Sequence, residues 1–419
     1  MFTLLLAALL PLIPQPNPPK AGEKLGPEGY KLVIKNGKPK ITAETKQGEF
    51  WAKVTLKQLK DRGFKEDVEI IDKPKYRMRG FMFDVGRKYF PMETLRKVVV
   101  ELAKYKFNTL HLHLNDNQIR PWANDPNGED WSKYYAAFRL ECETCPELTA
   151  KDGFYTKKEF REFQKWAKTK GVTIIPEFDS PAHALAFTRA RPEFGSPKYG
   201  MDHFDLDKMD KILPWMEKIF AEYLSGKDPV FIGPYCHIGT DEYDKRDAEK
   251  FRVYTDKMFR MVRKYGYKPC AWGALAHAAG STPVIADKDI TMDIWNNGFY
   301  NPAKAIEDGY SIVAIPDHEL YIVPKAGYYH DYLNLPNLYE NWEPCRIGDV
   351  RIPADHPQLL GGKFALWNDK LDLPTVDEVT DRIFKAIPTL GQKMWSGKVE
   401  GQTWEDFQQL ISSAPAVSR

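Results

Sequence analysis

The chain has 419 residues, of which 43% are hydrophobic, enough to bury the core of one large domain together with a smaller one. Its formal net charge is +2, and acidic and basic residues are mixed along its length without a long basic run. This distribution argues against nucleic acid as the main partner.

An apolar segment opens the chain at residues 1–13, and four prolines between positions 14 and 19 follow it. So short a segment cannot cross a bilayer as a helix, which takes about 20 apolar residues. Its length and position fit a secretory signal peptide, although no Lys or Arg precedes it. We therefore assign residues 1–20 to a signal-like leader, and we expect a secreted or periplasmic location without a membrane span.

A small α+β domain is predicted next, over residues 21–76. Residues 30–34 and 39–45 are expected to be two short strands around Asn36-Gly37, a strong hairpin signal. Residues 48–62 follow as a helix and residues 68–72 as a third strand.

Beyond Arg79 the pattern changes to apolar strands that alternate with amphipathic helices. The expected strands are residues 80–84, 109–114, 172–178, 235–239, 268–272, 291–295, 311–315 and 363–367. The expected helices are residues 92–105, 157–169, 208–224, 248–265 and 376–387. Eight such strands predict an α/β fold, a closed (β/α)8 TIM barrel over residues 77–395, followed by a C-terminal tail at 396–419. A doubly wound open sheet is the alternative, but no glycine-rich phosphate loop follows the first strand.

The most informative motif is His237-Ile238-Gly239-Thr240-Asp241-Glu242, which places two adjacent acids at the end of an apolar strand. Neighbouring side chains on an extended segment point to opposite sides, so the two carboxylates can serve different tasks. In a barrel of this type, chemistry gathers where strands end. The other strand ends carry Asp84, Arg87, His111, His113, Asn115, Asp116, Glu177, Asp179, His183, Trp272, Asp293, Trp295, Trp367 and Asp369.

The five cysteines leave at least one thiol unpaired within a monomer. Cys142 and Cys145 form a C-x-x-C, but no second pair of Cys or His completes a zinc site. A local disulfide or two idle thiols is the preferred interpretation. The sequence gives no sign of a required metal, and the oligomeric state stays open.

Several motifs in order resemble the family 20 glycoside hydrolases, the β-N-acetylhexosaminidases, over about residues 30–390. Residues 79–91 (RGFMFDVGRKYFP) are similar to the opening strand of that family's barrel, residues 108–118 (NTLHLHLNDNQ) to its second strand, and residues 175–183 (IPEFDSPAH) to its third. Residues 237–242 (HIGTDE) resemble its catalytic H-x-G-G-D-E, and residues 48–59 resemble the end of the small preceding domain.

The resemblance implies substrate-assisted hydrolysis, in which the 2-acetamido oxygen of the sugar attacks C1 and forms an oxazolinium ion; this family is an exception to the two-carboxylate scheme of ordinary retaining glycosidases. It implies that Asp241 orients the acetamido N–H and stays ionised. Glu242 would act as general acid and then as general base, with its pKa raised towards about 6. Tyr332, in Tyr332-Leu333-Asn334, would donate to the acetamido oxygen. No cofactor is implied, and the expected partner is an oligosaccharide or glycoconjugate.

The resemblance also implies a set of substrate-binding residues. Arg79 would bind ring hydroxyls as a charged fork. Asp116, Asp179 and His183 would form a polar network behind Glu242, although each could equally belong to a purely structural network. The remaining members of the set are His237 from the acidic motif, the pocket walls Trp272, Trp295 and Trp367, and the terminal-sugar contacts Asn334 and Asp369.

Departures from the family pattern bear on the exact sugar. Thr240 replaces the second glycine of the acidic motif, and Asn334 and Asp369 replace an Asp and a Glu that contact the terminal sugar. The shorter Asp369 would leave room for a modified or extended terminal unit. The expected activity is removal of terminal GlcNAc or GalNAc. The alternatives are a disaccharide-releasing relative such as a lacto-N-biosidase, or a barrel that binds sugars without cutting them.

Overall fold

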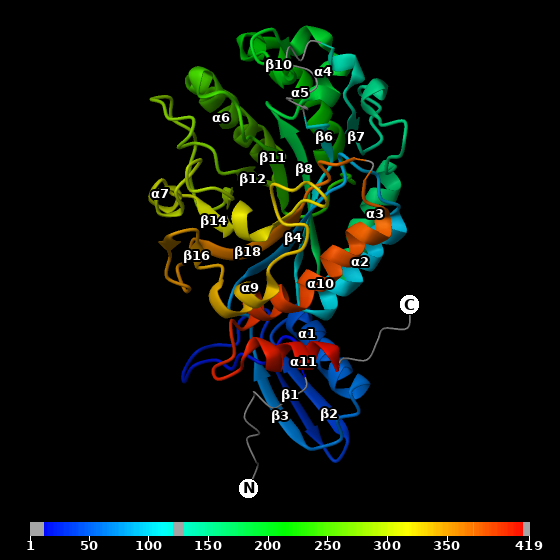
Figure 1. The fold of residues 1–419 in the computed structure, drawn as a ribbon, viewed down its shortest axis with the longest axis vertical. Coiled ribbons are helices and arrows are strands. Elements are labelled where there is room, and N and C mark those ends of the chain that lie inside the picture. The colour runs from blue at the N-terminus through cyan, green and yellow to red at the C-terminus, as the bar shows by residue number, and fades with distance from the viewer. Residues whose placement is uncertain (1–11, 120–129, 372, 414–419) are drawn as a thin grey trace.

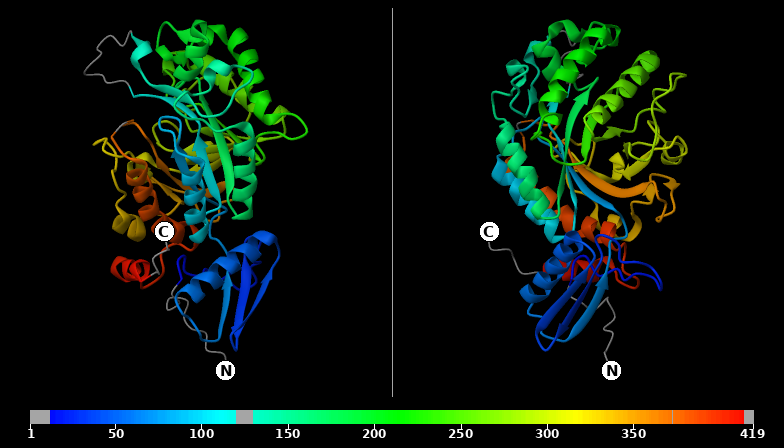
Figure 2. Two further views of the ribbon diagram at one scale, coloured as in Figure 1. Left: turned by 90° about the vertical axis from the view of Figure 1, so that its right-hand side faces the viewer. Right: turned by 180° about the vertical axis from the view of Figure 1, so that it is seen from behind.

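A computed structural model describes residues 12–119, 130–371 and 373–413; residues 1–11 of the predicted leader lie outside this range. Eight parallel strands close into a barrel surrounded by helices, and a small N-terminal domain lies beneath it (Figure 1). The two further views show the same arrangement, with the small domain beyond one end of the barrel (Figure 2). The predicted (β/α)8 barrel preceded by a small α+β domain is confirmed.

The small domain consists of one antiparallel sheet and one helix. Strands β1 (Tyr30–Lys35), β2 (Lys38–Ala43) and β3 (Val68–Asp72) pair in the order β2-β1-β3. Positive φ angles of 49° at Asn36 and 70° at Gly37 form the tight turn between β1 and β2. Helix α1 (Lys46–Asp61) begins at Thr45, whose hydroxyl accepts from two backbone N–H groups. Its apolar face packs on the sheet through Trp51 and Leu59.

The barrel strands follow the predicted order along the chain. They are β4 (Met78–Asp84), β5 (Thr109–His113), β8 (Thr173–Ser180), β11 (Tyr235–Gly239), β12 (Lys268–Trp272), β13 (Thr291–Ile294), β14 (Ser311–Ala314) and β18 (Leu359–Leu366). Each pairs in parallel with its neighbours, and the pairing of β14 with β18 closes the ring. Every residue of β4 and β5 is buried, because such strands are covered by helices on one side and by the barrel interior on the other.

Amphipathic helices cover the outside of the barrel. The main ones are α2 (Met92–Lys104), α3 (Lys157–Thr169), α5 (Met209–Leu224), α6 (Ala248–Lys264), the short α7 (Pro302–Glu307) and α10 (Val376–Trp395). Helix α2 illustrates the cause, because it buries Leu95, Val98, Val99 and Leu102 at helical spacing against the strands.

Shorter elements lie in the loops. After β5 and β8 come β6 (Asn115–Asn117), β7 (Ala136–Phe138), α4 (Leu185–Ala190), β9 (Gly195–Ser196) and β10 (Gly200–Phe204). The long link from β14 to β18 contains α8 (Asp317–Leu320), β15 (Tyr321–Ile322), α9 (Leu335–Asn341), β16 (Arg346–Ile347) and β17 (Val350–Arg351). Strand β15 pairs with the end of β18, which brings this link back over the barrel. Helix α11 (Trp404–Ser412) lies within the predicted tail, and its Phe407 ring stacks on Tyr339 of α9.

Residues 12–15, which fall within the predicted leader, pack where the two domains meet. Leu12 is buried in the core of the small domain, and the Ile13 N–H donates to Gln58 of α1. The Gln15 N–H donates to Gln392 of α10.

All five cysteines are free thiols, so Cys142 and Cys145 are not joined. Within the described ranges, none of the helices combines the length and the apolar run that a bilayer crossing requires.

Candidate active site

The two adjacent acids follow β11 directly, on a backbone that turns sharply. Gly239, Thr240 and Glu242 have φ angles of 71°, 67° and 46°, all in the left-handed region. For the β-branched Thr240 this conformation is rare and strained. Gly239 has a second reason to lack a side chain, because a Cβ there would stand 1.7 Å from Asp179 Oδ1. The sharp turn therefore brings Asp179, at the end of β8, against the start of the acidic motif.

Asp241 is a carboxylate without a protein donor for one of its oxygens. Its Oδ1 is buried and has no hydrogen-bond partner among the described residues. Burial raises the pKa of Asp241 to about 6, and the negative charge of Glu242 adds to the effect. Burial and the charge of Asp241 together raise the pKa of Asp179 well above its usual range. Asp179 is therefore the neutral acid of this pair, and Asp241 is the one poised to ionise.

Glu242 lies at one end of a chain of contacts. Its Oε2 is 3.3 Å from His183 Nε2, and His183 Nδ1 is 2.9 Å from Asp116 Oδ1. Asp116 Oδ2 in turn lies 2.6 Å from His113 Nε2. Despite burial, the neighbouring carboxylates raise the pKa values of His183 and His113 well above the usual range. Both imidazoles are therefore positively charged between carboxylates.

The expected raised pKa of Glu242 is wrong for the free protein. The hydrogen bond from His183 lowers the pKa of Glu242, and this effect outweighs that of burial. The side chain of Glu242 is still 52% exposed, so water can also stabilise its charge. The acid whose pKa is raised is Asp241 instead.

Arg79 was expected to bind the sugar, and its position contradicts this. Arg79 is the second residue of β4, so about 16 Å of strand separate it from the catalytic end. Its guanidinium is fully buried between the domains, where it pairs with Glu28 at 2.6 Å and lies over the Trp395 ring. Arg79 therefore joins the small domain to the barrel.

Arg87, rather than Arg79, is the arginine that the structure places at the site. Its guanidinium lies 2.8 Å from Asp116, 3.1 Å from Asp84 and 3.6 Å from Asp369. It also lies over the Trp367 ring at 5.6 Å. The position of Arg87 after the end of β4, rather than before it, is the sequence signal that distinguishes it from Arg79.

An apolar wall stands beside the acids. Trp272, Trp295 and Tyr321 belong to one buried cluster against which Trp367 packs. The Trp367 ring centroid is 5.6 Å from that of Trp272 and 5.7 Å from that of Tyr321. Such a wall of aromatic faces can hold the apolar face of a ring-shaped ligand.

The sequence did not single out Tyr321, and it assigned the role of the site tyrosine to Tyr332. Burial and then the charges of Asp317 and Asp241 raise the pKa of Tyr321, so its hydroxyl lies within the field of the acidic motif. Tyr332 is 41% exposed and donates to Asp381 on α10, outside the barrel. The predicted role of Tyr332 is therefore wrong, since its hydroxyl is turned away from the acids.

Asn334 also lies outside the site. It is exposed at the start of α9, where its side chain accepts from the Asn337 N–H as a helix cap. Asp369, by contrast, is at the site, where it lies beside Arg87 and accepts from the Tyr328 hydroxyl at 2.7 Å.

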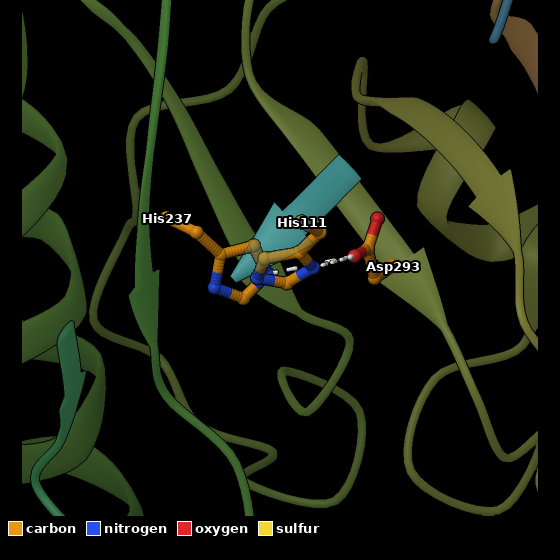
Figure 3. Close-up of side chains that lie close together, drawn as sticks. All are labelled: His111, His237 and Asp293. Atoms are coloured by element: carbon orange, nitrogen blue, oxygen red, sulfur yellow. Dashed lines mark ion pairs between the residues drawn. The ribbon is translucent and has the colours of Figure 1, made fainter. Parts of the chain in front are cut away.

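His237 lies below the site rather than in it. It is fully buried in the barrel interior, where His111, His237 and Asp293 converge from three strands (Figure 3). His237 Nδ1 is 3.1 Å from Glu177 Oε1, and Nε2 is 3.6 Å from Asp293 Oδ2. Its predicted contact with substrate is therefore wrong, because both ring nitrogens face protein groups. Glu177 is the shared partner, since it also accepts from the Trp272 indole at 2.7 Å.

Comparison with known proteins gives a consistent picture. The model of the catalytic domain of glycosyl hydrolase family 20 matches residues 76–398, and that of domain 2 of the same family matches residues 11–72. A beta-hexosaminidase of Akkermansia muciniphila is 26% identical over 92% of this chain and 82% of its own length. A lacto-N-biosidase of Bifidobacterium bifidum is 23% identical over 92% of this chain but only 34% of its own length. The crystal structure of a beta-N-acetylhexosaminidase from Bacteroides fragilis superposes with a TM-score of 0.74 at 23% identity, over 92% of this chain and 80% of that one, which supports the fold.

Proposed function

This chain is a glycoside hydrolase and belongs to glycosyl hydrolase family 20, and from that membership we propose that it removes terminal β-linked N-acetylhexosamine from glycans with retention of configuration. The observation that carries the proposal is the buried Oδ1 of Asp241, an acceptor without a donor among the described residues, next to the His183–Glu242 pair. A buried acceptor gains most from a donor that the ligand brings. The N–H of a 2-acetamido group is such a donor.

In the first step the acetamido oxygen attacks C1 while the bond from C1 to the leaving oxygen breaks. Glu242 gives its proton to that leaving oxygen. Asp241 accepts the acetamido N–H and stabilises the positive charge of the oxazolinium ion as it forms. The Tyr321 hydroxyl donates to the acetamido oxygen, the task that the sequence had assigned to Tyr332.

In the second step water attacks C1 from the side that the leaving group has vacated. Glu242, now ionised, accepts a proton from this water, and the oxazolinium ring opens to regenerate the acetamido group. Two inversions at C1 give net retention. Trp272, Trp295 and Trp367 hold the N-acetyl group and the ring, while Arg87 and Asp369 bind the outer hydroxyls.

Release of nitrophenol from an aryl β-N-acetylglucosaminide tests the activity, with the anomer of the product followed by NMR. We expect turnover, a β-anomer as first product and inhibition by a thiazoline that mimics the cyclised intermediate. An α-anomer, or a glycosyl ester trapped on the protein, would refute the mechanism. Lack of turnover at any pH would favour a sugar-binding barrel.

A disaccharide-releasing activity is the second candidate, since one of the similar proteins is a lacto-N-biosidase. The aryl glycosides of GlcNAc, GalNAc and lacto-N-biose, compared under one set of conditions, separate the candidates. We expect the two monosaccharide substrates to be preferred, because the Tyr328 hydroxyl and Arg87 both engage Asp369 at the outer edge of the site.

A further inference from the structure

A lysine lies in the interior of the barrel beneath the active site. Lys363 of β18 is fully buried, and its Nζ is 2.6 Å from Asp293 Oδ2 and 3.5 Å from His111 Nδ1. Gly80 on the neighbouring β4 makes room for it, because a Cβ there would stand 2.7 Å from Lys363 Cγ. The ammonium group thus contacts two of the three residues His111, His237 and Asp293, whose ligand atoms lie close enough together to hold a metal ion.

Lys363 is connected to the catalytic acid through protein contacts alone. His111 Nε2 lies 3.0 Å from Glu177 Oε2, and the same oxygen lies 2.6 Å from His113 Nδ1. From His113 the chain of contacts runs through Asp116 and His183 to Glu242, as described above. Another branch runs from Glu177 to the indole of Trp272 in the pocket wall.

The charges along this chain depend on the cation at its base. Burial and the charge of Lys363 lower the pKa of His111 to about 3, so His111 is neutral. With an ammonium facing Nδ1, the single proton of this imidazole belongs on Nε2, which lies 3.0 Å from Glu177 Oε2. Asp293 remains ionised, because Lys363 and His237 outweigh its burial and hold its pKa at about 2.

Resting on the proposed function, we propose that Lys363 is a positioning residue for the general acid. Its ammonium pairs with Asp293, keeps His111 in the Nε2–H form and thereby maintains the contacts that fix Trp272 and the His183–Glu242 pair. The groups that face it from the packed strands are Asp293 on β13, His111 on β5, His237 on β11, Glu177 on β8 and Cys270 on β12.

The test is Lys363→Met, with the pH profile of kcat/KM as readout. Without the ammonium, Asp293 can stay ionised only while His237 keeps its proton or if His111 takes one up. A histidine whose pKa is raised by this pairing stabilises the site at low pH and ceases to do so as pH rises through that pKa. We expect the alkaline limb of the kcat/KM profile to move to lower pH by about one unit. At pH values above this limb, activity should then be lower than that of the wild type by roughly tenfold, mainly through kcat.

Two variants control for structural damage. Lys106→Met removes another buried lysine, paired with Asp72 at 2.7 Å at the domain junction, and should leave the shape of the profile unchanged per folded molecule. Lys363→Met combined with Asp293→Asn removes both charges and should abolish the added pH dependence. Its kcat should stay lower than that of the wild type by roughly tenfold, because His111 is no longer held.

A pH profile of kcat/KM for Lys363→Met with the same shape as that of the wild type would overturn the proposal. So would a pH dependence that appears in Lys363→Met and persists in the double variant. If Lys363→Met does not fold, the double variant decides, and a wild-type kcat in it counts against the proposal. Thermal unfolding against pH is independent of turnover: the difference in Tm between Lys363→Met and the wild type should widen from pH 5 to pH 8. A constant difference would overturn the ion-pair argument even if the wild type proved inactive, and inactivity alone would fault only the proposed function.

Discussion

His183 joins Glu242, the proposed general acid, to a buried carboxylate on another strand. Its Nε2 lies 3.3 Å from Glu242 Oε2, while its Nδ1 lies 2.9 Å from Asp116 Oδ1. Because His183 itself has a positive φ of 54°, the ring is aimed by a strained backbone as well as by its two partners. The proton on Glu242 is therefore controlled from outside the acidic motif.

Glu242→Gln tests the role of that proton. We expect activity to fall by roughly 10²–10⁴-fold on substrates with poor leaving groups and much less on activated aryl glycosides. The reason is that a good leaving group departs without protonation. The measurement compares kcat/KM across a series of aryl leaving groups. Equal losses across the series would refute the assignment of Glu242 as the acid.

The pH dependence of activity should reflect the pKa values of Asp241 and Glu242, whose order is the reverse of the one expected from the sequence. In the free enzyme Asp241, with a pKa of about 6, holds a proton more readily than Glu242. Catalysis needs one proton on the pair, placed on Glu242 while Asp241 is ionised. As pH rises through about 6 the pair loses its last proton, so kcat/KM for poor leaving groups should fall through this range.

Asp241→Asn provides the control for this alkaline limb, the fall in kcat/KM as pH rises through about 6. It removes the site with the higher affinity for the proton, so the limb of the residual activity should move to lower pH, towards the lowered pKa of Glu242. The residual rate should be lower by roughly 10²–10³-fold, as expected for one preorganised electrostatic partner. A limb that stays near pH 6 would show that another group titrates there.

The fold and the acidic motif could be predicted because they depend on local sequence patterns. Strand and helix periodicity repeats along the chain, and all eight barrel strands lie close to their expected positions. The proximity of Asp241 and Asp179, by contrast, concerns residues that are far apart in sequence. Only the left-handed turn at Gly239 and Thr240 brings them together, and it was not anticipated.

The errors have physical reasons as well. Arg79 and Arg87 lie in one motif, and the distinction between them depends on which end of β4 faces the ligand. Tyr321 follows β14 through the four-residue helix α8 and then pairs with β18, a return of the chain that periodicity does not reveal. The value of a pKa depends on burial and on partners from several strands, so the order of Asp241 and Glu242 lay beyond sequence reasoning.

Tyr321→Phe and Tyr332→Phe form a matched pair that tests the corrected tyrosine. Loss of the Tyr321 hydroxyl should lower kcat by roughly 10²-fold, as for removal of one donor to a developing charge. Loss of the Tyr332 hydroxyl breaks only a half-exposed contact with Asp381 and should leave kcat within about twofold. The reverse order, measured on the same aryl substrate, would restore the original assignment.

Arg79→Met and Arg87→Met should separate stability from binding. Arg79→Met leaves Glu28 without its buried partner and should cost about 3 kcal/mol of unfolding free energy, with kcat/KM per folded molecule little changed. Arg87→Met should lower kcat/KM by roughly 10²-fold, because it leaves Asp84, Asp116 and Asp369 without their shared cation. Denaturant unfolding and steady-state kinetics on both variants distinguish the effects. A binding defect in Arg79→Met would contradict its place at the domain junction.

Gly239→Ala tests whether the turn before the acids sets their geometry. Gly239 and Gly266 both have positive φ, at 71° and 84°, but only Gly239 is crowded. Gly266→Ala meets no atom within 4 Å and should therefore cost about 1 kcal/mol, the price of a left-handed alanine, without affecting kcat. Gly239→Ala incurs the same backbone cost, and its Cβ also collides with Asp179 Oδ1. Because this collision must displace Asp179 or the acidic motif itself, we expect kcat to fall by roughly 10²-fold, as for misplacement of a catalytic group by about 1 Å. Equal kcat in the two alanine variants, measured per folded molecule, would show that the contact between Gly239 and Asp179 does not position Asp241.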